Sequence, residues 1–259
     1  MKKKHIVISI LCGLLALVIG VLAVTLTTPL SYELNSDKFD KLYNPYGPNG
    51  EVVPTPLSDV DWFFMAKNCG KTMNLAYRIN PSISNLKACY SIYRYKNYIY
   101  GNFYGYDMPD DFVTNCVKYT KAVYETPYEK LQGNITYVPI GNNMENQMKL
   151  TFGIEYALAL YFDGQVKQSQ ALVDELMTLV DTENIAFSYT LKDYFYYVNA
   201  TTADKAVESW VLEKETAVEQ LIKDSGKLKA FYEMHDRFFS NPDLTTYVNG
   251  DWEEYRESD

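Results

Sequence analysis

The chain has 259 residues, 47% of them hydrophobic and 22% charged, a typical balance for a globular protein with one apolar core. The formal net charge is -9. Because Lys2, Lys3 and Lys4 precede an apolar run, the remainder carries 21 basic against 33 acidic groups, or -12. A domain of this charge repels phosphate backbones, which argues against nucleic-acid binding. The frequent use of Lys, Asn and Tyr suggests an AT-rich bacterial genome.

The N-terminal residues predict one membrane-spanning helix. Residues 1–5 form a basic cytoplasmic stub, and an uncharged run dominated by Ile, Leu, Val and Ala follows over residues 6–26. A helix over this run rises about 31 Å, the thickness of the hydrocarbon core of a bilayer. Because basic residues beside a span stay in the cytoplasm, we expect a single-pass cell-membrane protein with its C-terminal domain on the extracytoplasmic side.

A cleaved signal peptide is the alternative interpretation of the same segment. Such peptides have an apolar core of about 7–15 residues, followed by a small-x-small cleavage site. The run here is longer, and the nearest site, Ala23-Val24-Thr25, fits that pattern poorly. We therefore favour an uncleaved signal-anchor, with a secreted product as the alternative.

Three cysteines fall in the exported part of the chain: Cys69, Cys89 and Cys116. One pair could form a disulfide in an oxidising compartment, in any of three pairings, leaving one free thiol. Alternatively, all three are buried apolar residues. Their spacing matches no zinc-binding pattern.

Residues 27–57 predict a spacer, since they contain several prolines and glycines and little periodic apolar pattern. The extracytoplasmic helical domain then covers residues 58–240, and residues 241–259 form an acidic tail. Ser58 opens a sequence with the form of a capping box. The first helix of the domain is therefore expected to begin there and to end before Pro81.

The next part of the chain supports two interpretations. Several positions of residues 82–106 suit a helix face, but the aromatic run at 93–100 has the composition and partial alternation of a strand or hairpin. We favour a helix because the flanking segments are helical. Another helix is expected over residues 108–124, with Asp110 or Asp111 near its positive N-terminal end.

The C-terminal half predicts a series of helices joined by short connections. The first, over residues 148–161, is apolar almost all round and should be deeply buried. Asp163-Gly164 ends it, and four more helices are expected over residues 166–180, 183–197, 203–222 and 228–238. Short connections between helices force antiparallel neighbours. The predicted fold is therefore all-α, with antiparallel helix hairpins behind one N-terminal transmembrane helix.

The helix–glycine–helix unit at residues 148–180 resembles a tetratricopeptide hairpin. The resemblance lies at the positions of that repeat's large, small and turn residues: Tyr156, Ala157, Leu160, Gly164, Ser169 and Val173. A shift by one period of that family, about 34 residues, places Ala203 on Ser169 and Val207 on Val173. Leu191 departs from the pattern at the small position, and no proline closes either unit. The resemblance covers about residues 148–215 and implies a stack of helix hairpins that contacts proteins; an irregular bundle is the alternative.

Few residues of the sequence suggest a catalytic or metal-binding role. His235 could act as a base beside a carboxylate, but we interpret it as a core or half-buried residue of its helix. With one histidine in the domain a two-histidine zinc site is excluded, and no GxSxG or Walker-type loop occurs. Three acid pairs are interpreted as helix caps or solvated faces: Asp59/Asp61, Asp110/Asp111 and Asp174/Glu175. We predict no catalytic residue, no metal site and no cofactor.

A tyrosine cluster is the most unusual local feature of the sequence. It comprises Tyr93, Tyr95, Tyr98, Tyr100, Tyr104 and Tyr106. Exposed tyrosines combine apolar area with a polar tip and favour recognition of proteins or sugars. The same residues also suit packing into the core. The cluster is nevertheless the best candidate binding site that the sequence offers.

Together these features favour a membrane-anchored extracytoplasmic helical module that binds an envelope protein or polysaccharide. An extracellular or cell-wall hydrolase that uses carboxylates or His235 is one alternative. A structural subunit of a membrane assembly is the other. Of these classes, an enzyme is disfavoured.

Overall fold

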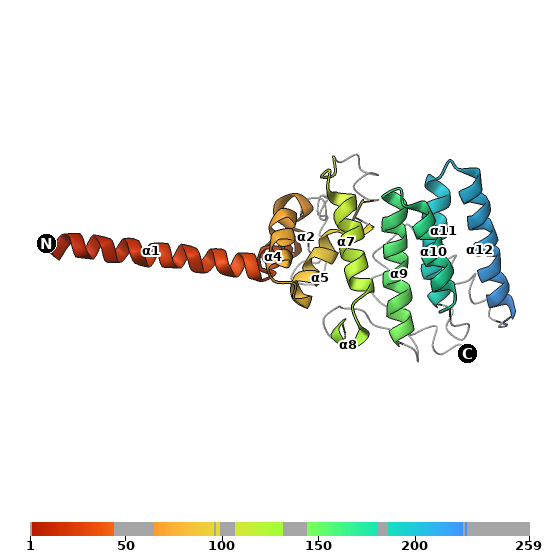
Figure 1. Ribbon diagram of the computed structural model, residues 1–259, viewed down its shortest axis with the longest axis horizontal. Coiled ribbons are helices and arrows are strands. Elements are labelled where there is room, and N and C mark those ends of the chain that lie inside the picture. The colour runs from red at the N-terminus through yellow and green to blue at the C-terminus, as the bar shows by residue number, and fades with distance from the viewer. Residues whose placement is uncertain are drawn as a thin grey trace, which may run out of the picture. The chain divides into compact units, whose positions relative to one another are not determined.

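The computed structural model describes residues 2–43, 65–95, 97–98, 107–131, 144–180, 186–224 and 226. Every regular element among them is a helix, so the described part of the chain is all-α, as the sequence predicts (Figure 1). The chain forms two compact units. Unit 1 comprises residues 1–139 and 143–176, and unit 2 comprises residues 140–142 and 177–259.

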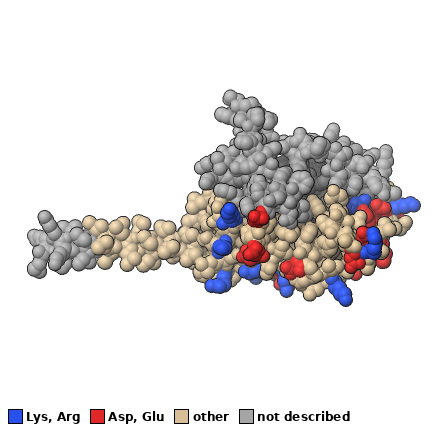
Figure 2. Space-filling view, turned by 90° about the horizontal axis from the view of Figure 1, so that it is seen from above, with Lys and Arg blue, Asp and Glu red and all other residues tan. Residues whose placement is uncertain are grey.

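Helix α1 (Lys2–Thr27) is the described helix that is long and apolar enough to cross a membrane. The qualifying segment is Ile10–Thr27, and its large aliphatic side chains are exposed, Leu17 at 65%. Figure 2 shows the described surface of this rod free of Lys, Arg, Asp and Glu. Near its C-terminal end α1 meets α2 (Leu30–Tyr43) and α4 (Lys71–Ile79) (Figure 1). An exposed apolar surface of this extent makes α1 a candidate membrane-spanning helix by length and composition.

Helix α2 lies within residues 27–57, the segment for which the sequence predicts a spacer. Pro29 directly precedes the helix, where its missing N–H is not needed, and its carbonyl accepts from the Glu33 N–H at 3.0 Å. Tyr32 of α2 packs against the core. Residues 44–57 lie outside the described part.

The predicted first helix of the domain is observed from residue 65 onward. A π-helical turn, η1 (Ala66–Gly70), leads into α4, and residues 58–64 lie outside the described part. Helix α4 ends before Pro81, as expected, and the Asn80 N–H donates to the Ala76 carbonyl at 2.8 Å.

Helix α5 (Ile83–Ile92) confirms the helical interpretation for the first part of residues 82–106. Ser82 caps it, because its side-chain oxygen accepts from the Asn85 N–H at 3.3 Å. The helix ends at Tyr93, whose backbone has left the helical region. Residues 99–106 lie outside the described part.

The remaining helices of unit 1 are α7 (Phe112–Tyr124), the short α8 (Tyr128–Leu131), α9 (Met144–Phe162) and α10 (Val166–Met177). Helix α9 packs extensively along α7. Its interior is deeply buried, as predicted, with these side chains at most 4% exposed: Leu150, Phe152, Ile154, Ala157, Leu158, Ala159 and Leu160.

Two glycines shape this part of unit 1. A Cβ at Gly153 would lie 2.5 Å from the Leu176 side chain and 3.1 Å from Tyr124, so only glycine permits the close packing of α9 here. Gly164 has a φ of +78°, the left-handed conformation that ends α9 where the sequence predicts a break.

Unit 2 contains α11 (Ala186–Thr201) and α12 (Lys205–Asp224), which pack along each other. The Asp204 carboxylate caps α12 by accepting from the Ala206 N–H at 2.9 Å. Lys192, only 6% exposed, donates to Glu219 at 3.2 Å. These helices confirm two of the four predicted after residue 164, and the helix predicted over residues 228–238 lies outside the described part.

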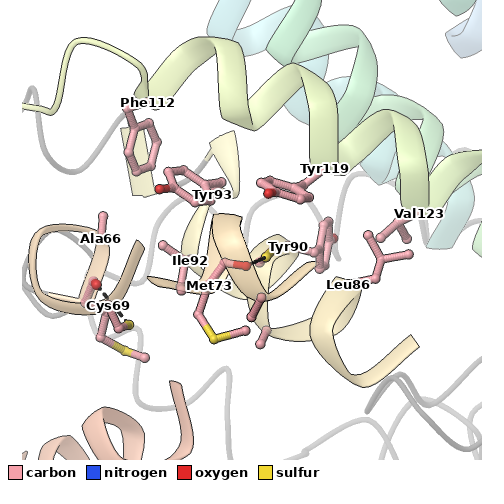
Figure 3. Close-up of a cluster of buried hydrophobic side chains, with 14 of the residues drawn as sticks. Ala66, Cys69, Met73, Leu86, Tyr90, Ile92, Tyr93, Phe112, Tyr119 and Val123 are labelled. Atoms are coloured by element: carbon pink, nitrogen blue, oxygen red, sulfur yellow. Dashed lines mark hydrogen bonds between the residues drawn. The ribbon is translucent and has the colours of Figure 1, made fainter. Parts of the chain in front are cut away.

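The core of unit 1 combines aromatic, aliphatic and thiol side chains from η1, α4, α5 and α7 (Figure 3). Tyr93 packs between Phe112, at 5.2 Å between ring centroids, and Tyr119, at 5.6 Å. The three cysteines that follow α1 are free and at most 2% exposed: Cys69, Cys89 and Cys116. They therefore match the apolar interpretation rather than the disulfide.

Candidate functional site

The predicted binding tyrosines are packing residues wherever the structure describes them. Tyr93 and Tyr95 are each 2% exposed. Tyr98 is partly buried, and its ring lies 6.2 Å from that of Phe112 and 5.4 Å from that of Phe162. The other three lie outside the described residues, so binding through them stays a prediction: Tyr100, Tyr104 and Tyr106.

The Tyr93 hydroxyl belongs to a polar network within the core. It accepts from the Asn74 amide at 3.1 Å, and the Tyr119 hydroxyl donates to the Asn74 oxygen. Lys118 donates to the Tyr119 hydroxyl at 3.2 Å. Burial raises the pKa of both tyrosines, which keeps their hydroxyls neutral. The network therefore satisfies buried polar groups and orients the two rings.

A second polar cluster joins α5 to α9 and consists of Tyr90, Arg94 and Glu155. Glu155 is 4% exposed and lies in the apolar middle of α9. The Tyr90 hydroxyl donates to Oε2 of Glu155 at 2.5 Å, and Arg94 donates to the same oxygen through Nε at 3.3 Å and to Oε1 through its terminal nitrogen. The guanidinium carbon of Arg94 also lies 5.4 Å from the Tyr90 ring centroid.

The electrostatics of this cluster favour a structural role. Burial raises the pKa of Tyr90 well above its ordinary value, and the Glu155 carboxylate adds to that rise. The same carboxylate raises the pKa of Arg94. Both oxygens of Glu155 are occupied by donors from the protein, so the carboxylate holds two helices together and is not presented to a substrate.

The buried thiols are poor nucleophiles. Burial raises the pKa of Cys69 to about 11 and that of Cys89 to about 12. It also raises the pKa of Cys116, with a further contribution from Glu155. Because the thiolate is the reactive form, these protonated side chains do not support a role as catalytic nucleophiles.

The acid pairs act locally where they are described. Asp111 precedes α7 and accepts from the Asn115 amide at 2.9 Å. Glu175 accepts from the Tyr124 hydroxyl at 3.3 Å and pairs with Lys149 at 3.8 Å. Among the described residues no three His, Cys, Asp or Glu side chains gather in a way that could hold a metal ion. Three other candidates lie outside the described residues: Asp59, Asp61 and His235.

The site with the clearest functional meaning is the point where α1 joins the rest of unit 1. The last carbonyls of a helix lack intrahelical partners. Here the Thr27 carbonyl accepts from the side-chain amides of Asn80, at 2.7 Å, and Asn85, at 3.2 Å. Asn85 is fully buried and also donates to the Asn80 carbonyl at 2.8 Å. We call Thr27, Asn80 and Asn85 the junction.

The threonine hydroxyls at the end of α1 are satisfied inside the helix. Thr25, Thr27 and Thr28 each donate to the carbonyl four residues earlier, at 2.9, 2.7 and 2.8 Å. A hydroxyl bonded in this way presents no unpaired donor to a hydrocarbon environment. The hydroxyl groups at the end of α1 are thus chemically compatible with an apolar environment.

Sequence reasoning missed the two polar contacts that organise unit 1. Asn80 and Asn85 lie 53 and 58 residues from Thr27, and Glu155 lies 61 residues from Arg94. The one local signal was a charged residue within an otherwise apolar helix, which requires a buried partner. No family model, curated protein or solved structure matches the chain.

Proposed function

We propose that this chain is a single-pass cell-membrane protein that displays a helical binding module on the extracytoplasmic side. The observation that carries the proposal is α1, whose aliphatic side chains are exposed along Ile10–Val24 while its C-terminal end is hydrogen-bonded into a folded unit. A bilayer is the environment that such a rod requires. Lys2, Lys3 and Lys4 support a cytoplasmic N-terminus.

A binding role, with an envelope protein or polysaccharide as the partner, fits the described side chains better than catalysis does. The buried carboxylate and thiols of unit 1 are paired or protonated. The resemblance of residues 148–215 to tetratricopeptide hairpins supports a protein partner, and the predicted contacts are Tyr100, Tyr104 and Tyr106.

Membrane attachment is tested by washing membranes that contain the full-length chain with alkaline carbonate. An integral protein stays in the membrane pellet, whereas a peripheral or secreted product is released. The matched variant is Leu17→Arg, which should be retained less in the membrane pellet. A charge in the middle of a span costs about 2.5–3.5 kcal/mol of insertion free energy. Release of the unmodified chain, or a mature protein that lacks α1, would contradict the proposal.

Topology is tested with a membrane-impermeant maleimide on intact cells. Lys205, whose side chain is 87% exposed, provides the reporter variant Lys205→Cys. Its control is Lys2→Cys in the predicted cytoplasmic stub. We expect the first to be labelled in intact cells and the second only after permeabilisation. The reverse pattern would place the domain in the cytoplasm.

The binding role is tested by cross-linking in intact cells, followed by purification of the full-length chain. Replacing Tyr100, Tyr104 and Tyr106 together with serine should reduce recovery of the cross-linked component several-fold. The control is Tyr196→Ser, which removes a tyrosine that is 56% exposed in unit 2. Equal recovery from both variants would exclude the predicted tyrosines as the contact.

A further inference from the structure

Two exposed apolar side chains of unit 1 lie on the helices that meet α1. Outside α1, the large apolar side chains exposed in the described part of unit 1 are Leu34, at 61%, and Ile79, at 51%. Ile79 directly precedes Asn80, and Leu34 lies in the first turns of α2, which follows α1 directly. The two side chains thus come from different helices, and both of those helices meet α1.

The junction also coincides with the expected edge of the bilayer. The apolar segment Ile10–Thr27 rises about 27 Å, close to the thickness of a hydrocarbon core. In the proposed anchoring, Thr27 lies at the C-terminal boundary of the span. Because Asn80 and Asn85 bind the Thr27 carbonyl, the neighbouring Ile79 lies beside that boundary.

Several contacts fix α1 to the rest of unit 1. The junction supplies two hydrogen bonds, and Leu30 at the start of α2 donates to the Thr28 hydroxyl at 3.4 Å. Tyr32 then packs against the core. Residues on both sides of the connection after α1 are therefore bonded to or packed against the rest of unit 1.

We propose that the end of unit 1 that carries α1 is seated on the lipid surface, with Ile79 and Leu34 in the interfacial layer. This inference rests on the proposed membrane anchoring. The exposed Arg78, next to Ile79, can reach lipid phosphates, while Glu33, next to Leu34, carries the opposite charge. With both signs present and a net charge of -12 beyond the anchor, a zwitterionic lipid surface is the matching partner.

The test uses the full-length chain in phosphatidylcholine vesicles whose acyl chains carry bromine, which quenches tryptophan at short range. Ile79→Trp and Leu34→Trp report on the proposed seat. Lys167→Trp, at an exposed position of α10, is the control within unit 1. Emission of the unmodified chain is subtracted because it contains three tryptophans.

We expect bromination to reduce the added emission of Ile79→Trp and Leu34→Trp by about half or more, and that of Lys167→Trp very little. Equal quenching at all three positions, in vesicles that retain the chain after a carbonate wash, would overturn the seat but not the anchor. A chain that does not float with the vesicles would overturn both.

The role of the junction is tested in the Ile79→Trp background. Adding Asn80→Ala removes one of the two amides that hold α1, so we expect weaker quenching at position 79. Asn199→Ala, at an exposed asparagine of α11, is the matched control and should leave the quenching unchanged. Equal quenching in both double variants would show that the Asn80 amide does not hold unit 1 on the surface.

Discussion

Helices α1 and α9 are both apolar around most of their circumference, yet they bury that surface differently. The aliphatic side chains of α1 are exposed along its described length, and its membrane-length segment carries no charge. Helix α9 is enclosed by protein and carries Glu155 in its middle, bound by Tyr90 and Arg94. The buried carboxylate marks α9 as a helix with a protein partner, whereas the uncharged and exposed α1 is the helix for which we propose a lipid environment.

The space around the glycines also differs between the two helices. A Cβ at Gly153 of α9 would collide with Leu176, whereas one at Gly20 of α1 would have nothing within 4 Å. Close packing against protein leaves no room for an added methyl group at position 153 of α9, whereas the surface of α1 at position 20 has room for one.

The largest expected effect comes from breaking the charged contact of α9. Glu155→Ala leaves Arg94 without its carboxylate and Tyr90 without its acceptor. Because the Arg94 side chain is 37% exposed, we expect a loss of about 2–4 kcal/mol in the free energy of unfolding, below the full cost of an orphaned buried charge. Denaturant unfolding of the full-length chain in detergent measures it.

Glu125→Ala is the matched control, since Glu125 is 61% exposed and pairs with Lys121 at 3.7 Å. It should change the free energy of unfolding by about 0.5 kcal/mol or less. If both variants lost the same stability, the polar cluster would not be what joins α5 to α9.

The next largest effect is expected at alkaline pH, which should destabilise the core of unit 1 without changing the attachment through α1. The folded-state pKa values of Cys69, about 11, and Cys89, about 12, exceed the ordinary value of 9.0. Their contribution to stability is complete below pH 9. As pH rises toward 11 and 12 the unfolded chain loses these protons first, so the free energy of unfolding falls. The raised pKa of Tyr90 adds to the loss above pH 10.

The measurement is the unfolding midpoint of unit 1 between pH 8 and pH 11, beside the retention of the chain in vesicles. Cys69→Ala should flatten the decline of the midpoint. Attachment through α1 should not change, because it depends on apolar burial. A midpoint independent of pH up to 11 would show that the thiols are not buried as described.

A smaller effect on stability is expected when the glycines of α9 and α1 are replaced by alanine. Gly153→Ala should destabilise unit 1 by about 1–3 kcal/mol because the added methyl meets Leu176 and Tyr124. Gly20→Ala should leave both stability and membrane retention unchanged. Thermal unfolding of the two variants in the same detergent compares them directly. Equal shifts would mean that α9 is packed less closely than the structure shows.

The sequence predicts those elements whose signal is local. An uncharged run indicates α1, an apolar pattern with a glycine break indicates α9, and Pro81 marks the end of α4. Helix α2 was missed because residues 27–57 contain several prolines and glycines and little periodic apolar pattern.

The candidate sites depended on contacts that no local pattern encodes. Exposure of the tyrosines could not be predicted, because an aromatic run is equally suited to a surface and to a core. Tyr93 is buried partly because Gly70 leaves room for its hydroxyl, 2.5 Å from where a Cβ would lie. The junction could not be predicted, because its two side-chain amides bind a carbonyl more than 50 residues away in the sequence.

The central claim is that lipid shields the apolar surface of α1 as the surrounding protein shields that of α9. Hydrogen–deuterium exchange of the full-length chain in vesicles tests this claim most directly. We predict that amides in the apolar segment of α1 exchange as slowly as those in the buried middle of α9. Exchange along α1 as fast as at the fraying ends of α12, or loss of the α1 peptides from the mature chain, would contradict the account.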